Sequence, residues 1–215
     1  MPPEVVNRAH PADVVQLVSI FRIASKKRID IMIDAVAVPN EFGIRSYLRI
    51  AGDGDGAVLR TLRRQIESLG LATQVEFLGE VPGTAKDELL AEADLFLLPS
   101  DDENFKIGLA EALSHGVPSV ASSSVAAAHF MKDRGGIVSK DPGGAAVAGA
   151  VAKLVQSSDW QALRASVRAV ALASFSWDAV SLQWRQKLHL TLDSLSHPLR
   201  TTPPPHTVPN FGYGE

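Results

Sequence analysis

The sequence predicts an α/β fold: one doubly wound domain with a parallel sheet of about six strands. Short apolar runs alternate along the chain with longer amphipathic stretches, which is the pattern of βαβ units around a parallel sheet. Glycine or proline closes several of these stretches, as Pro39, Gly70 and Pro99 do. In such folds ligands bind beyond the carboxyl ends of the strands, so the loops that follow the strands are the candidate site.

The expected elements follow from hydrophobic periodicity. The first helix, for example, carries Ile29, Ile33 and Val36 at helical spacing. Strands are expected at 14–21, 46–52, 74–81, 94–100, 118–122 and 135–138, and helices at 28–38, 56–70, 85–93, 106–115, 143–156, 159–175 and 177–195.

The expected domain organisation has three parts. Residues 1–13 form an amino-terminal extension, residues 14–195 form the α/β domain, and residues 196–215 form a proline-rich tail. The tail has too little apolar content to pack and is expected to be disordered.

Composition excludes several kinds of function. The formal net charge of −3 gives no basic field for nucleic acid, so no nucleic-acid partner is expected. The absence of cysteine excludes disulfides, thiolate zinc sites and a cysteine nucleophile, and the six histidines lack metal-ligand spacing, so no metal site is expected. No stretch approaches the roughly 20 apolar residues of a membrane span, and the first residues lack the apolar core of a secretory signal. The expected location is cytoplasmic, with peripheral membrane contact left open.

The segment PSDDENFKIGLAEALSHGVPSVAS (99–122) holds two glutamates eight positions apart, Glu103 and Glu111. A helix that starts near Lys106 presents unpaired N–H groups, which suit a phosphate. Glu111 would then lie about 12 Å along the helix from Glu103, and carboxylates accept hydrogen bonds from hydroxyls. A nucleotide sugar, with its diphosphate between two polyols, fits this layout. The alternative is structural: Glu103 caps the helix and Glu111 is solvated.

The segment FRIASKKRID (21–30) follows the first expected strand and carries Arg22 and Lys27. Their charges could converge on an anion at the rim of the sheet. The alternative is a solvated basic loop, and Lys26 and Arg28 beside them leave the assignment ambiguous.

The segment AGDGDGA (51–57) satisfies the dinucleotide pattern G-x-G-x-x-A with Gly52, Gly54 and Ala57. This pattern raises the alternative of a nicotinamide-dependent oxidoreductase. Against it, Asp53 and Asp55 would repel a pyrophosphate, and a tight turn that needs glycine explains the same residues. A nucleophilic hydrolase has no support, because the sequence has no G-x-S-x-G elbow.

Taken together, these segments resemble the carboxyl-terminal, donor-binding domain of a family 4 retaining glycosyltransferase, which is a Rossmann-like half of the GT-B fold. FRIASKKRID resembles the family's G-R-L-x-x-x-K-G-x-D, and PSDDENFKIGLAEALSHGVPSVAS resembles its P-S-x-x-E-x-F-G-x-x-x-x-E-A segment. The strand, glycine turn and helix of LRIAGDGDGAVLRTLRRQIESLG and the later FSWDAV also match. The resemblance covers residues 14 to 192.

The resemblance implies a role for each matching residue. Arg22 and Lys27 would neutralise the donor diphosphate, Glu111 would hold the ribose hydroxyls, and Glu103 would contact the sugar ring. The implied catalytic set is thus Arg22, Lys27 and Glu103. The remaining implied donor-binding residues are Gly52, Asp53 and Gly54 in the glycine turn, Val81, Asn104, Phe105, Lys106 and Ile107.

The implied activity is metal-independent, retaining transfer of a sugar from a UDP-, GDP- or ADP-sugar to an acceptor, with no cofactor beyond the donor. Several departures qualify it: Lys106 and Phe21 replace glycines of the pattern, and 124–127 replaces a G-G-x-x-E segment. The largest departure is that no acceptor domain precedes residue 14, so the enzyme is expected to be incomplete without an acceptor-domain partner. The alternative is a non-catalytic nucleotide-sugar-binding module or a degenerate paralogue.

Overall fold

The computed structural model of the chain describes residues 11, 14–38, 43–101, 107–131, 136–138, 140, 142–176, 178–182, 184–186 and 188. The chain divides into two units, residues 1–176 and 177–215, and the first contains the sheet. Apart from Pro11, the expected amino-terminal extension lies outside the described residues, and so does the whole expected tail.

The sheet has six strands, all paired in parallel, in the order β3-β2-β1-β4-β5-β6. The strands are β1 Val14–Ile20, β2 Arg45–Ala51, β3 Val75–Gly79, β4 Leu95–Leu98, β5 Ser119–Ser122 and β6 Gly136–Val138. The strand order reverses between β1 and β4, which makes their carboxyl ends the topological switch point. The prediction of a doubly wound parallel sheet is confirmed.

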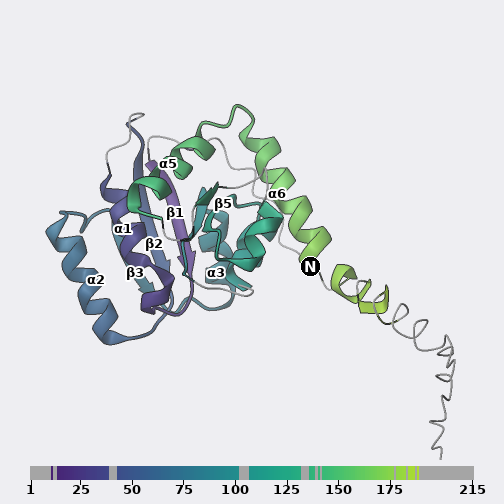
Figure 1. Cartoon of the computed structure of the whole chain (residues 1–215), viewed down its shortest axis with the longest axis horizontal. Coiled ribbons are helices and arrows are strands. Elements are labelled where there is room, and N and C mark those ends of the chain that lie inside the picture. The colour runs from purple at the N-terminus through teal and green to yellow at the C-terminus, as the bar shows by residue number, and fades with distance from the viewer. Residues whose placement is uncertain are drawn as a thin grey trace, which may run out of the picture. The chain divides into compact units, whose positions relative to one another are not determined.

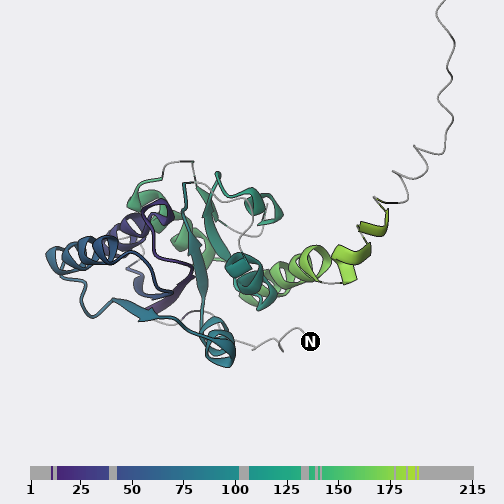
Figure 2. The same cartoon turned by 90° about the horizontal axis from the view of Figure 1, so that it is seen from below.

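Helices cover both faces of the sheet (Figures 1 and 2). One face carries α1 Ile29–Ala37, α2 Gly56–Ser68 and α5 Gly144–Val155, and the other carries α3 Gly83–Ala91, α4 Ile107–Ser114 and α6 Trp160–Phe175. The bounds of these helices and of the strands agree with the sequence prediction to within two residues. The sequence prediction missed two 3-10 turns, η1 Ser25–Lys27 and η2 Ala126–Met131, in segments that carry no apolar periodicity.

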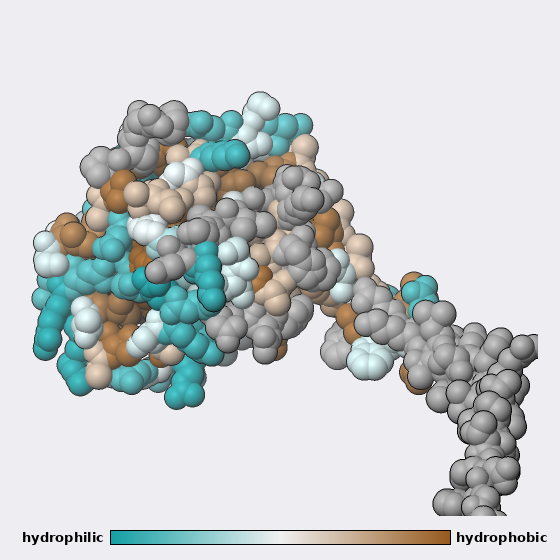
Figure 3. Space-filling view, in the orientation of Figure 1, coloured by the Kyte–Doolittle hydropathy of each residue, from teal (hydrophilic) through white to brown (hydrophobic). Residues whose placement is uncertain are grey.

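The core lies between the sheet and its two helical layers. Every residue of β4 and β5 is buried, as expected for central strands covered on both faces. By contrast, α2 buries only Leu62 and Ile66 and turns its polar side outward. Figure 3 shows the hydrophilic residues that gather over this helix.

Helix α6 belongs to the same packed domain, although it follows the last strand. The Arg164 side chain is 1% exposed, and its Nη1 donates to the carbonyl of Ala93 at 3.1 Å. Arg168 Nη1 donates to the carbonyl of Ser114, at the end of α4, at 2.5 Å. These two contacts join α6 to the segment before β4 and to the end of α4.

The second unit contains helical residues at 178–182, 184–186 and 188, inside the expected helix 177–195. Its large apolar residues Leu182, Trp184 and Leu188 are each more than half exposed. In the part of the chain that the structure describes, none of the helices combines the length and apolar character needed to cross a membrane.

Two glycines allow the loop after β2 to touch the loop after β1. At Gly52, where φ is +129°, an added Cβ would lie 1.9 Å from the carbonyl oxygen of Phe21. At Gly54 an added Cβ would lie 2.1 Å from the carbonyl oxygen of Ile23. Real Cβ atoms cannot approach backbone so closely, so both positions require glycine for chain packing.

We expect Gly54→Ala to lower the free energy of unfolding by about 1–3 kcal/mol, because the new methyl group overlaps a backbone carbonyl. Gly149→Ala, in α5, is the matched control: apart from its own helix backbone and its chain neighbours, no described atom lies within 4 Å of the added Cβ. There alanine should raise stability by about 0.5–1 kcal/mol. Urea denaturation of both variants measures this. Equal stability of the two variants would contradict the close approach.

Candidate functional site

A cleft of about 790 Å³ opens at the carboxyl ends of β1, β2 and β3. It is lined by Ile20, Phe21 and Arg22 after β1, Ala51 to Asp55 after β2, Glu80, Val81 and Pro82 after β3, and Lys86 of α3. Five residues expected from the sequence to bind the donor therefore line the same cleft: Arg22, Gly52, Asp53, Gly54 and Val81.

Backbone hydrogen bonds hold two of these loops side by side. The N–H of Phe21 donates to the carbonyl of Ala51 at 3.0 Å, and the N–H of Ile23 donates to the carbonyl of Asp53 at 2.9 Å. Asp55 returns a bond from its N–H to the carbonyl of Ile23 at 3.3 Å. Parallel pairing thus continues past the ends of β1 and β2, and it fixes the backbone from which Arg22 projects.

The two aspartates of the glycine turn accept hydrogen bonds from nearby backbone N–H groups. Asp55 Oδ1 accepts from the N–H groups of Ala57, at 2.7 Å, and Val58, at 3.4 Å, so it is the N-cap of the helix. Asp53 Oδ1 accepts from the N–H of Gly54 at 2.7 Å. Because the Asp55 carboxylate already occupies the N-terminus of α2, a pyrophosphate has no place there, and the dinucleotide interpretation of G-x-G-x-x-A loses its support.

Arg22 and Lys27 come together, but with different exposure. Both line a second hollow of about 520 Å³ that adjoins the loop 22–27, and Arg22 also lines the main cleft. Arg22 is exposed, whereas Lys27, at the end of η1, is 4% exposed. The exposed arginine is therefore the group of this pair that an anion in the cleft reaches directly.

The start of α4 is packed against the end of β1. An added Cβ at Gly108 would lie 2.7 Å from the carbonyl oxygen of Ile20, so the first turn of the helix lies at the switch point. Ile107, which precedes it, is 68% exposed. The other expected donor-binding residues of this segment lie outside the described residues: Glu103, Asn104, Phe105 and Lys106.

Glu111 of α4 is linked to the cleft by an ion pair. Its Oε1 lies 2.5 Å from Lys86 Nζ, and both side chains are about one-third exposed, at 30% and 28%. Lys86 in turn lines the cleft beside Val81. Glu111 is therefore not the solvated helix residue of the structural alternative. The sequence analysis missed Lys86, because it stands in a short helix that carries no motif.

A histidine after α4 also lies close to α3. His115 Nε2 lies 3.3 Å from Asp87 Oδ1, and its Nδ1 lies 2.9 Å from the carbonyl oxygen of Glu111. Helix α3 and the end of α4 thus approach each other at Lys86–Glu111 and again at Asp87–His115.

The arrangement combines an exposed guanidinium, a carboxylate–ammonium pair and a neighbouring basic turn around one cleft. Such a set suits a ligand that is anionic at one part and carries hydroxyls at another. Within the described residues, no three histidine, aspartate or glutamate side chains form a group that could hold a metal ion.

The fold and the cleft define a Rossmann-like domain of the GT-B type. The sequence model of the family "Glycosyl transferases group 1" matches residues 5–169, and the chain belongs to this family.

Three similar proteins illustrate the relationship. The putative colanic acid biosynthesis glycosyltransferase WcaL of Escherichia coli is 34% identical over 118 residues, which are 52% of this chain and 29% of that protein. A GDP-mannose-dependent alpha-(1-6)-phosphatidylinositol dimannoside mannosyltransferase of Mycobacterium tuberculosis is 29% identical over 174 residues, 79% of this chain and 43% of that protein. The crystal structure of Anabaena HepE in complex with UDP-glucose aligns with a TM-score of 0.68 at 25% identity, over 83% of this chain and 48% of that chain. The chain thus spans less than half the length of each of these proteins.

We expect the Lys86–Glu111 pair to contribute at most about 1 kcal/mol to stability, because both groups are partly screened by solvent. A double-mutant cycle of Lys86→Met, Glu111→Gln and the double variant, followed by urea denaturation, measures their coupling. Independent, additive losses would show that the two side chains are not paired in the free chain.

Proposed function

We propose that this chain is the donor-binding domain of a family 4, retaining, metal-independent glycosyltransferase. It binds a nucleoside-diphosphate sugar, with UDP, GDP or ADP as the nucleotide, and the sugar passes to an acceptor. The acceptor site belongs to a second domain, in a longer form of this protein or on a partner, because the chain matches less than half of the relatives described above.

The observation that carries the proposal is the shared cleft. It joins the loops after β1, β2 and β3, and it brings Arg22, the Gly52–Gly54 turn and Val81 to one rim. Lys86 connects Glu111 to the same rim. Three segments that the family pattern assigns to one ligand thus share this cleft, and Glu111 of a fourth segment is joined to it through Lys86.

The chemistry follows from the charges. Departure of a nucleoside diphosphate develops negative charge on the leaving oxygen, and fixed positive charge stabilises it. Arg22, exposed at the cleft, supplies that charge, and Lys27 adds to the field from within the loop. This positive charge from the protein takes the part that a metal ion plays in other transferases. Glu111 accepts hydrogen bonds from the ribose hydroxyls.

The relatives support the class of donor. One is described as GDP-mannose-dependent, and another was solved with UDP-glucose bound. Both ligands are nucleoside-diphosphate sugars. The nucleobase differs between them, so the titrations below test which nucleotide this chain binds.

The first experiment is calorimetric titration of the purified chain with UDP, GDP and ADP. We expect one of them to bind, and we expect Glu111→Ala to weaken that binding by about 1–3 kcal/mol, because the ribose hydroxyls lose a charged acceptor. The matched control is the 2′,3′-dideoxy form of the same nucleotide, to which wild type and variant should bind equally. If the variant binds the ribonucleotide as wild type does, the placement of the ribose is wrong.

Arg22→Ala tests the diphosphate. We expect it to weaken binding of the nucleoside diphosphate by about 1.5–3 kcal/mol, the range for hydrogen bonds to charged groups, and to leave binding of the nucleoside unchanged. Isothermal titration with both ligands measures the difference. Equal losses for the two ligands would remove the diphosphate role from Arg22.

Two further experiments test the alternatives of a non-catalytic binding module and of an oxidoreductase. Nucleotide binding without sugar transfer, when an acceptor-domain protein and acceptor are supplied, would favour the non-catalytic binding module. Binding of NADH in place of UDP, GDP and ADP would favour the oxidoreductase.

A further inference from the structure

Arg28 has an unusual backbone conformation. It connects η1 directly to α1 with φ 50° and ψ 46°, and among the described residues it is the sole non-glycine residue with positive φ. In this left-handed region the Cβ atom crowds a backbone oxygen, which is why glycine is the usual occupant. The family pattern K-G-x-D, aligned with residues 27–30, also has glycine here.

The charge of Arg28 adds a second cost. Its carbonyl accepts the first helical hydrogen bonds of α1, from the N–H groups of Ile31 and Met32, so the residue stands at the helix N-terminus. A cation at that end opposes the helix dipole. Neither the backbone nor the helix favours arginine, and a reason for its presence must come from its side chain.

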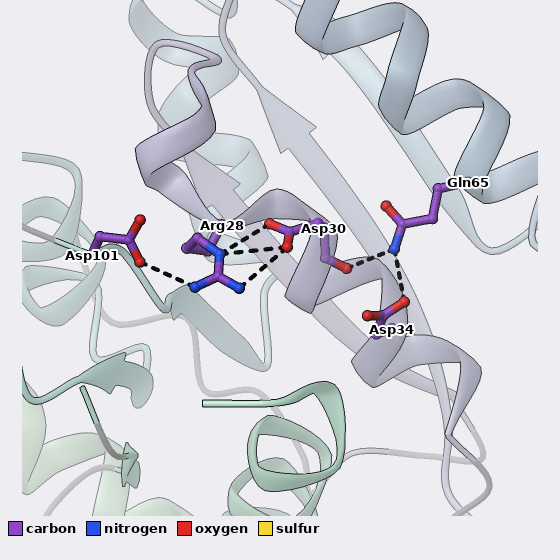
Figure 4. Close-up of polar contacts among 5 residues, drawn as sticks. All are labelled: Arg28, Asp30, Asp34, Gln65 and Asp101. Carbon is purple, nitrogen blue, oxygen red and sulfur yellow. Dashed lines mark hydrogen bonds and ion pairs between the residues drawn. The ribbon is translucent and has the colours of Figure 1, made fainter. Parts of the chain in front are cut away.

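The guanidinium of Arg28 bridges two carboxylates from different parts of the rim (Figure 4). Its Nε and Nη2 lie 3.4 Å from the carboxylate oxygens of Asp30, in the first turn of α1. Its Nη1 lies 3.2 Å from Oδ1 of Asp101, which follows β4. The Arg28 side chain is 25% exposed, and the two aspartates are about half exposed.

A backbone bond lies beside this bridge. The N–H of Asp101 donates to the carbonyl of Lys26, in η1, at 3.0 Å. The loop after β1 and the loop after β4 are therefore joined twice, once through their backbones and once through Arg28. These are the two loops at the switch point of the sheet.

The row of contacts continues to α2 on the other side of Arg28. Gln65 Nε2 donates to the Asp30 carbonyl at 3.0 Å and to Asp34 Oδ1 at 2.7 Å. Arg28 thus lies in the middle of a polar row that runs from α2, across the start of α1, to the loop after β4.

We propose that Arg28 is a positioning residue: it clamps the loop after β4 to the loop after β1 and so sets the geometry of the donor site. The proposal rests on the proposed function. A guanidinium can reach two carboxylates at once through separate N–H groups, whereas a lysine ammonium is a point charge and glycine has no side chain. This explains why arginine occupies a position that the backbone reserves for glycine.

The test uses Arg28→Gly, which should fold because glycine is the residue best suited to this conformation. We expect the Asp101 amide to exchange with solvent about fivefold faster, as measured by NMR, and the affinity for the best-bound nucleoside diphosphate to fall about fivefold. Arg28→Lys should give much of the same loss. Arg64→Gln, a change of an exposed arginine on α2, is the matched control and should alter neither quantity.

Asp101→Asn tests the partner. It should reproduce both effects of Arg28→Gly, and the double variant should be no worse than either single variant, because all three remove the same contact. Additive losses, or an Asp101 amide whose exchange is unchanged in both single variants, would overturn the clamp.

Two outcomes separate this inference from the function. If the wild-type chain binds none of UDP, GDP and ADP, the proposed function fails, while the exchange of the Asp101 amide still tests the clamp. If exchange accelerates and nucleotide affinity does not change, the clamp exists but the positioning role is overturned.

Discussion

The cleft depends on one steric constraint, the contact between the glycine turn after β2 and the extended loop after β1. The missing Cβ atoms of Gly52 and Gly54 allow the carbonyls of Phe21 and Ile23 to approach the turn. Backbone hydrogen bonds then extend the pairing of β1 and β2 beyond the sheet. The parallel pairing fixes the backbone of the loop after β1. The positions of the Arg22 side chain and of the start of η1 therefore both depend on the absence of side chains at Gly52 and Gly54.

The extent to which sequence predicts this structure differs between the fold and the site. Apolar periodicity predicted the strands and helices because each buried face repeats locally along the chain. The spacing of Gly52 and Gly54 predicted a tight turn. It did not indicate whether the space left by the missing side chains is filled by a ligand or by another loop. Lys86 and Glu111 are 25 positions apart, and their pairing depends on how α3 packs against α4, which has no local signature. The left-handed Arg28 was not predicted either, because the residue type argues against that conformation. The glycine at this position of the family pattern was the signal that could have indicated it.

The charged groups around the cleft are held by contacts or by burial in the chain without ligand. Glu111 is paired with Lys86, Asp55 caps α2, and Lys27 is almost wholly buried. Fixed partners hold charges in place before a ligand arrives, which is the condition for electrostatic preorganisation. If the chain binds a nucleotide sugar as proposed, a ribose at Glu111 must share that carboxylate with the Lys86 ammonium or displace the ammonium. Of the predicted pair Arg22 and Lys27, Arg22 is the exposed cation.

The anchoring of α6 has a consequence for where this domain can be cut. The family match ends at residue 169, in the middle of α6, but Ala171 further along the helix is fully buried and Arg164 is bonded to the junction before β4. A truncation at the end of the match would expose part of the core and shorten a helix that covers α4. The compact unit extends to residue 176, so a recombinant fragment that ends there keeps the whole of α6 and its buried residues.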